Sequence, residues 1–184
     1  MLQRKSLDEL NERIIFSAEE ILPFSAITKM HVDSGLTLSE ICEASIRISD
    51  NTAANLVIEE LGGIDEFRES LREIGDNVTE PARLEFELNI FTPDSIDDTS
   101  TPRQFAKDLE LYLLSDLLSE EKKSLLANCI SDNSVTDNSV TDNLIKKRRK
   151  KPIVVAIMTR RNEENERHNN ALIRDITKMI FNSP

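Results

Sequence analysis

The sequence predicts a mostly helical protein of the α+β class. Several stretches carry apolar residues at the three-to-four-residue spacing of amphipathic helices, and most of them begin with a capping residue. A single β-branched run, residues 152–159, has the composition of a buried strand. One more amphipathic stretch, residues 163–181, follows that strand. Helices therefore dominate, and strand content is small.

Length and composition fit one domain with a real core, because the 184 residues are 39% hydrophobic. The net charge of −11 argues against a general binder of nucleic acid or anionic membranes, since phosphate groups repel such a surface. The first residues lack the apolar run of a signal peptide, and no stretch reaches the roughly 20 apolar residues of a membrane span. As written, the chain is expected in the cytoplasm.

The first predicted helix covers residues 38–48. Thr37 and Glu40 have the spacing of a capping box, and apolar residues follow at helical intervals. Ser49 and Asp50 interrupt this helix and, as capping residue types, can restart a second one over residues 52–61. Gly62-Gly63 then offers a left-handed stop.

Further helices follow the same logic. Phe67, Leu71 and Ile74 form an apolar stripe that ends at Gly75. Thr101-Pro102-Arg103-Gln104 combines a cap, a proline at the first helical position and a glutamine at the third, and so predicts a helix start. Ser119 is expected to cap the next helix.

A long irregular segment, residues 80–100, separates these helices. It contains Pro81 and Pro93 and shows no sustained periodicity. Loops of this length are uncommon inside compact domains and tend to be functional.

The chain divides into three regions on this basis. Residues 1–130 form a helical region, and residues 152–184 supply a strand and the last helix. Residues 131–151 read as a linker, because Asn133-Ser134-Val135-Thr136-Asp137 is repeated at 138–142 and a basic run, 146–151, follows. One strand cannot form a sheet by itself. Cys42 and Cys129 are too few for a disulfide framework and are expected to be small buried apolar residues.

Two groups of residues resemble the class A serine β-lactamases. Ser49-Asp50-Asn51 matches that family's Ser-Asp-Asn motif, and the match extends over residues 44–56, whereas the second copy at 131–133 lacks this context. Downstream, a set of residues matches the family's Ω loop, here residues 83–98: Arg83, Glu85, Leu88, Asn89 and Asp98. Residues 99–102, the strand at 152–159 and the helix at 167–181 also resemble the family.

The resemblance implies the all-α subdomain of the serine β-lactamase and penicillin-binding fold, with a residual strand and C-terminal helix of the α/β subdomain. It also implies hydrolysis of a β-lactam antibiotic through an acyl-enzyme, without a cofactor or metal. Ser49 would shuttle a proton toward the lactam nitrogen, and Asn51 would bind the substrate's side-chain amide. Glu85 would activate the deacylating water held with Asn89. Family members are secreted or periplasmic.

The same resemblance implies that Arg83 and Asp98 pair to close the loop, and that Cys42 stands where some members carry half of a disulfide. Each residue also has a plain structural interpretation. Ser49 and Asn51 can simply cap a helix junction, and Glu85 and Asn89 can lie in a solvated loop.

The sequence departs from the family in two motifs. No Ser-x-x-Lys precedes Ser49, and Ser119-Glu120-Glu121-Lys122, which fits the letters, lies beyond the loop at a helix start. Lys-Thr-Gly is missing, because all four glycines precede Asp76. These departures imply a truncated or internally deleted member that is inactive alone, with a complementing fragment as a partner.

The sequence also allows an alternative function of a different class from the enzyme. The six basic residues at 146–151 are compatible with a non-enzymatic interaction module that contacts phosphate groups, although a solvated linker is the commoner meaning of such a run. No aromatic residue interrupts the run to stack on bases.

Overall fold

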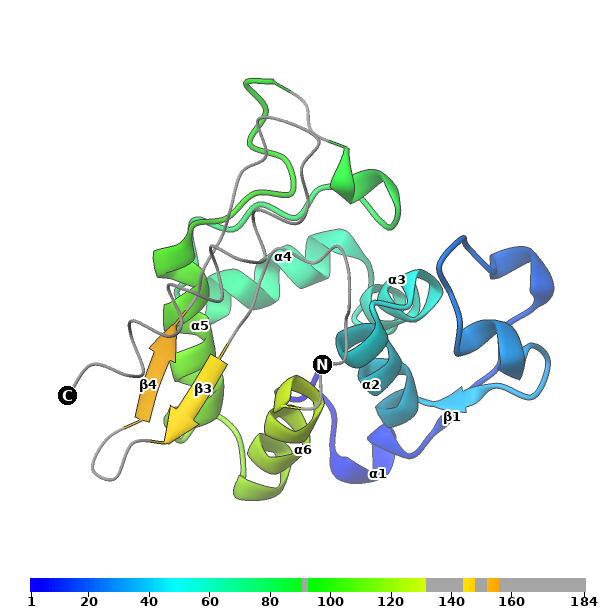
Figure 1. The fold of residues 1–184 in the computed structure, drawn as a ribbon, viewed down its shortest axis with the longest axis horizontal. Coiled ribbons are helices and arrows are strands. Elements are labelled where there is room, and N and C mark those ends of the chain that lie inside the picture. The colour runs from blue at the N-terminus through cyan, green and yellow to red at the C-terminus, as the bar shows by residue number, and fades with distance from the viewer. Residues whose placement is uncertain (91–92, 132–143, 148–151, 156–184) are drawn as a thin grey trace. The chain divides into compact units, whose positions relative to one another are not determined.

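The computed structural model describes residues 1–90, 93–131, 144–147 and 152–155. The chain divides into two compact units, Met1–Val135 and Thr136–Pro184. The first unit is mostly helical with one small two-stranded sheet, and the second contains another two-stranded sheet (Figure 1). The predicted class, α+β and mostly helical, is confirmed.

The N-terminal part of the first unit consists of short elements that the sequence analysis did not assign. Helix α1, Leu7–Leu10, is capped by Ser6. Strands β1, Arg13–Ile14, and β2, Leu36–Thr37, pair antiparallel. Between them lie two 3₁₀ turns, η1 at Ala18–Glu20 and η2 at Thr28–His31. Elements of two to four residues leave too little periodicity to be recognised from sequence.

Gly35 allows the close approach of these two strands. Its φ is +68°, and a Cβ atom added there would lie 2.2 Å from the carbonyl oxygen of Ile14. Only glycine fits this position without displacing the neighbouring backbone.

Helices α2, Leu38–Ile48, and α3, Asn51–Glu60, form the centre of the unit. Both were predicted. The capping box of Thr37 and Glu40 starts α2, and the Asp50 side chain caps α3 by accepting a hydrogen bond from the backbone of Ala53. Gly62 and Gly63, with φ of +101° and +98°, follow the end of α3.

The core joins α2 and α3 to the N-terminal elements. Its buried residues share an apolar character and come from three stretches of the chain: Phe16, Leu36, Ile41, Ala44, Ala53 and Leu56. Burial of this apolar surface fixes how α2 and α3 lie against each other, and with them the junction that carries Ser49.

The remaining helices also follow the predictions. Helix α4 spans Ile64–Glu73, α5 spans Pro102–Leu114 after the Thr101 cap, and α6 spans Glu120–Ser131. Helix α2 packs against α1, α3 and α6, and α5 packs against α6. The described part of the predicted loop between α4 and α5 contains one 3₁₀ turn, η3 at Glu87–Asn89. None of the described helices has the length and apolar character to cross a membrane.

The second unit supplies a partner for the predicted strand. Strand β4, Pro152–Val155, pairs antiparallel with β3, Leu144–Lys147, which the sequence analysis had placed in a linker. Two residues of the basic run, Lys146 and Lys147, therefore belong to a strand. Residues 156–159, the predicted helix at 163–181 and the repeat at 133–142 lie outside the described residues.

Candidate functional site

The junction between α2 and α3 places Ser49 at the surface. Ser49 ends α2 in the left-handed conformation, with φ of 54° and ψ of 43°, and its side chain is exposed. A non-glycine residue in this region is uncommon and carries a backbone cost, so the surrounding structure must hold it there.

Asp50 provides that hold. Its carboxylate is fully buried and accepts four hydrogen bonds. Oδ2 accepts from the backbone amides of Ile27, at 2.9 Å, and Thr28, at 3.0 Å; Oδ1 accepts from the Thr28 hydroxyl, at 2.8 Å, and the Ala53 amide, at 3.0 Å. Asp50 therefore joins the start of α3 to the turn η2 and fixes the residues on either side of it.

Asn51 is the first residue of α3. Its Nδ2 donates to the carbonyl oxygen of Pro23 at 2.9 Å, and its backbone amide donates to the carbonyl oxygen of Phe24. Phe24 has a positive φ of 61° and is 86% exposed. Ser49, Asn51 and the exposed ring of Phe24 thus belong to neighbouring segments at this junction.

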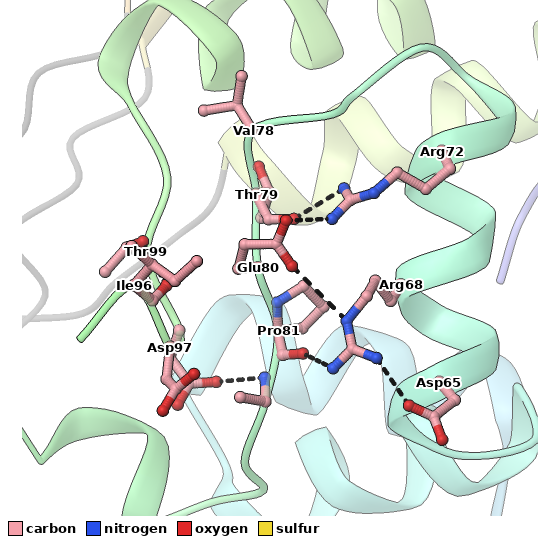
Figure 2. Close-up of polar contacts among 12 residues, drawn as sticks. Asp65, Arg68, Arg72, Val78, Thr79, Glu80, Pro81, Ile96, Asp97 and Thr99 are labelled. Carbon is pink, nitrogen blue, oxygen red and sulfur yellow. Dashed lines mark hydrogen bonds and ion pairs between the residues drawn. The ribbon is translucent and has the colours of Figure 1, made fainter.

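The long loop has a neck where its two ends pair. The backbones of Glu80 and Thr99 form an antiparallel bridge. Two arginines of α4 hold the first residues of the loop: Arg72 Nη2 lies 2.5 Å from Glu80 Oε1, and Arg68 Nη2 donates to the Pro81 carbonyl oxygen at 2.6 Å (Figure 2). The neck is therefore fixed to α4.

The predicted ion pair between Arg83 and Asp98 is present. Arg83 Nε lies 2.6 Å from Asp98 Oδ2, and the Asp98 side chain is only 8% exposed. Asp98 Oδ1 also accepts from the backbone amides of Ala82 and Arg83, and Arg83 Nη2 donates to the Ile90 carbonyl oxygen. Burial alone would raise the pKa of Asp98, but these hydrogen bonds and the arginine charge outweigh it, and the pKa is lowered.

Glu85 and Asn89 meet inside the closed loop. Asn89 Nδ2 donates to Glu85 Oε2 at 3.0 Å, across the turn η3. Glu85 is half-buried, and this burial raises its pKa, with the Asn89 hydrogen bond opposing the rise and the charge of Asp98 adding to it. A carboxylate with a raised pKa is a stronger proton acceptor than an exposed one.

Asn55 connects this loop to α3, and the sequence analysis did not single it out. Its Nδ2 donates to the carbonyl oxygen of Glu85 at 3.0 Å, and its Oδ1 accepts from the Glu85 amide at 2.8 Å. Asn55 lies one helical turn after Asn51, so the two side chains share a face of α3. Two features of the sequence could have indicated Asn55. It lies four residues after Asn51, and it falls within residues 44–56, the stretch that resembles the family.

The structure brings together two of the predicted pairs, Glu85 with Asn89 and Arg83 with Asp98. Among the described residues no hydrogen bond joins Ser49 or Asn51 directly to Glu85. The connection runs through α3, whose first turn carries Asn51 and whose second turn carries Asn55.

Ser119 behaves as a helix cap. Its Oγ accepts from the backbone amide of Lys122 at 3.4 Å, while the Lys122 ammonium donates to the carbonyl oxygen of Lys5 at 2.6 Å. Ser119 and Lys122, the two ends of the Ser-x-x-Lys pattern at 119–122, thus make contacts that stabilise helix ends. No group of three or more metal-ligating side chains occurs in the part of the chain that the structure describes.

A groove of about 770 Å³ lies beside α2 and α6, apart from the loop. Its lining is mainly apolar and includes Leu10, Ile46, Val57, Leu125 and Leu126, together with both cysteines. Cys42 and Cys129 are free and half-buried, so they are less buried than the small buried apolar residues that the sequence predicted. Burial raises the pKa of Cys42 to about 11, and it raises the pKa of Cys129 as well.

Comparison with known proteins gives a consistent result. The model of the β-lactamase enzyme family matches residues 3–149. β-Lactamase ROB-1 of Haemophilus influenzae is 36% identical over 206 aligned residues, which cover all of this chain and 68% of the relative.

Solved structures agree with the sequence matches. The class A β-lactamase from Clostridium kluyveri has a TM-score of 0.85 at 32% identity, covering 99% of this chain and 79% of that one. A reconstructed ancestral class A β-lactamase has a TM-score of 0.87 at 32% identity, covering 94% of this chain and 75% of that one.

Proposed function

Because the chain belongs to the class A β-lactamase family, we propose that residues 49–98 form the deacylating half of a β-lactam-hydrolysing site. The single observation that carries this proposal is the contact between Glu85 and Asn89 inside a loop closed by Arg83 and Asp98. A general base must be held within hydrogen-bond reach of its proton donor, and the closed loop provides this restraint.

Glu85 is the base in this scheme. A water molecule held by Glu85 and Asn89 attacks the carbonyl carbon of an acyl-serine ester, and Glu85 accepts the proton that the water loses. The ester then breaks, the serine oxygen recovers a proton, and the opened lactam leaves as a carboxylic acid. The raised pKa of Glu85 supports this role because it brings the carboxylate closer to the basicity that the proton transfer needs.

Ser49 and Asn51 serve the substrate in the same scheme. The exposed Ser49 hydroxyl passes a proton to the lactam nitrogen during acylation, and Asn51 binds the side-chain amide of the substrate. Their fixed positions around the buried Asp50 support these assignments. Both residues come from the junction whose backbone the carboxylate of Asp50 holds in place.

The nucleophile must come from a segment other than these 184 residues. Loss of the serine of a serine hydrolase lowers turnover by about 10⁶-fold, and loss of one oxyanion donor lowers it by about 10²–10³-fold. Without a Ser-x-x-Lys ahead of Ser49 and without Lys-Thr-Gly, the 184-residue chain should not hydrolyse a penicillin at a detectable rate. A complementing fragment that carries Ser-x-x-Lys on an amphipathic helix is the proposed partner.

The groove beside α2 and α6 is suited to such a helix. Its apolar lining and its volume of about 770 Å³ match the side chains of one face of a short helix. Helix α2 lines this groove and also ends at Ser49, so a helix bound there would lie on the element that carries Ser49.

The decisive experiment mixes the chain with a peptide that bears Ser-x-x-Lys on an amphipathic helix and follows penicillin hydrolysis and acylation by mass spectrometry. The proposal expects a peptide-dependent acyl adduct on the peptide serine and slow turnover. With Glu85→Gln in the chain, the adduct should form and persist, because its hydrolysis lacks a base. An adduct on Ser49 or Ser119 without peptide, or an equal adduct lifetime with Glu85→Gln, would contradict the proposal.

A further inference from the structure

One buried carboxylate outside the proposed site has an oxygen without a donor. Asp76 is fully buried in the turn after α4. Its Oδ1 accepts from the backbone amides of Val78, at 2.8 Å, and Thr79, at 2.9 Å. Its Oδ2 is buried and has no hydrogen-bond partner among the described residues. An ionised carboxylate oxygen left in this state would be costly.

A second carboxyl group faces Asp76 from α5. Asp108 lies two helical turns into α5, and its Oδ1 accepts from Gln104 Nε2 at 2.8 Å. Asp76 and Asp108 lie close enough to interact by charge and by a side-chain hydrogen bond. Two adjacent carboxylates cannot both be ionised without repulsion, whereas one carboxyl O–H can donate to the other group.

We propose that Asp76 and Asp108 share one proton, and that this proton joins α5 to the turn from which the long loop begins. The Asp108 hydroxyl then donates to Asp76 Oδ2, which supplies the missing hydrogen bond. The carbonyl of Asp108 continues to accept from Gln104. This inference does not depend on the proposed function.

The Asp76–Asp108 pair lies next to the residues that join the two ends of the loop, because Asp76 accepts a hydrogen bond from the Thr79 amide. The Thr79 hydroxyl lies 2.7 Å from the Ser100 hydroxyl, and the bridge between Glu80 and Thr99 follows directly. Arg72 donates to the carbonyl oxygens of Asp76 and Thr79, so the same turn also rests on α4; Figure 2 shows Arg72 beside Thr79 and Glu80. Loss of the shared proton would place two negative charges between the turn and α5, and would loosen the neck.

The direction of the titration follows from the surroundings. Burial first, and then the charge and hydrogen bond of Asp76, raise the pKa of Asp108 to about 6, with Gln104 and Lys107 opposing the rise. Other charged or titratable groups near the pair are Arg72 and Tyr112, and the pKa of Tyr112 is raised by burial and by the charge of Asp108. The folded pKa of Asp108 exceeds the ordinary value, so the stabilisation is present at acid pH and is lost as pH rises through about 6.

Asparagine variants test the shared proton in the full 184-residue chain. In Asp108→Asn the side-chain amide can donate permanently to Asp76 Oδ2, and its oxygen can still accept from Gln104. In Asp76→Asn the amide can donate to Asp108 instead. Either variant replaces the shared proton with a hydrogen that does not titrate. Asp116→Asn, an exposed aspartate just beyond the same helix, is the matched control.

Urea unfolding at pH 5 and pH 7.5 gives the readout. The unfolding equilibrium constant of the original chain should rise with pH more than that of Asp108→Asn, by about tenfold at most, because only the part of the shift above pH 5 is sampled and partial exposure of Asp108 screens it further. Asp116→Asn should behave as the original chain. In carbon-13 spectra, one aspartate carboxyl signal should titrate near pH 6 and vanish in Asp108→Asn.

The proposal is overturned if the original chain and Asp108→Asn show the same pH dependence of unfolding. It is also overturned if no aspartate carboxyl signal titrates between pH 5 and pH 7. If Asp76→Asn does not fold, Asp108→Asn and the carbon-13 titration decide the question on their own.

Discussion

Ser49 combines an exposed hydroxyl with a backbone conformation that costs free energy. Its φ of 54° lies in the left-handed region, where a residue with a Cβ atom is disfavoured by roughly 1–2 kcal/mol. Ser49→Gly should therefore stabilise the chain by about 1 kcal/mol relative to Ser49→Ala, measured by urea unfolding. Both variants remove the hydroxyl, so the comparison isolates the backbone term. Equal stability of the two variants would show that the junction is not strained.

Asn55 acts at the same scale, because it satisfies both backbone groups of Glu85. Asn55→Leu should leave a half-buried amide and carbonyl without partners and should lower stability by about 1–3 kcal/mol. The loss should be accompanied by faster proteolysis within residues 80–90. Asn77→Ala, at an exposed asparagine, is the control and should leave both measurements unchanged. A stable Asn55→Leu chain with normal protease resistance would show that Glu85 is positioned by the loop alone.

At the scale of elements, the ion pair between Arg83 and Asp98 closes the long loop. Arg83→Met should leave the Asp98 carboxylate with two backbone donors and no cation, and should destabilise the loop by about 2–3 kcal/mol. Hydrogen exchange at the amides of Ala82 and Arg83 should accelerate in this variant. Arg103→Met, which changes an exposed arginine on α5, should leave the exchange rates as they were.

The same loop should respond to acid in the direction that Asp98 sets. The folded pKa of Asp98 is lowered, so its contribution to stability is present above the ordinary aspartate pKa and is lost as pH falls through the folded value. The Ala82 amide should therefore lose its protection from hydrogen exchange in strongly acidic solution. Asp98→Asn should remove this acid dependence, and an unchanged acid transition in that variant would assign it to another group.

At the scale of the whole molecule, the groove between α2 and α6 is the proposed binding site for the complementing fragment. Ile46→Glu should abolish binding of an amphipathic Ser-x-x-Lys peptide, because a charge would enter the apolar lining. Isothermal titration calorimetry measures the binding directly. Ile96→Glu, at an isoleucine that is 68% exposed in the loop, is the control and should bind normally. Peptide binding that survives Ile46→Glu would place the fragment elsewhere.

Several features were predictable from the sequence because their causes are local. Capping boxes and apolar spacing gave α2 its observed bounds, and the Thr101 cap with Pro102 gave the start of α5. The ordered set Ser49, Asn51, Glu85 and Asn89, together with its context, indicated the family that the comparisons then showed. The roles of these residues remain proposals.

Other features depended on contacts between residues far apart in the chain, which no local pattern encodes. Asn55 meets Glu85 across 30 positions and Asp76 meets Asp108 across two different elements, so neither pairing could be read from spacing. Strand β3 carries two lysines and read as linker, and only its pairing with β4 makes it a strand. The sequence by itself determined the helices from α2 to α6 and the family, since caps and periodicity act within a few residues. The tertiary structure alone decided which buried polar groups meet, because burial makes each unpaired group costly and so selects its partner from anywhere in the fold.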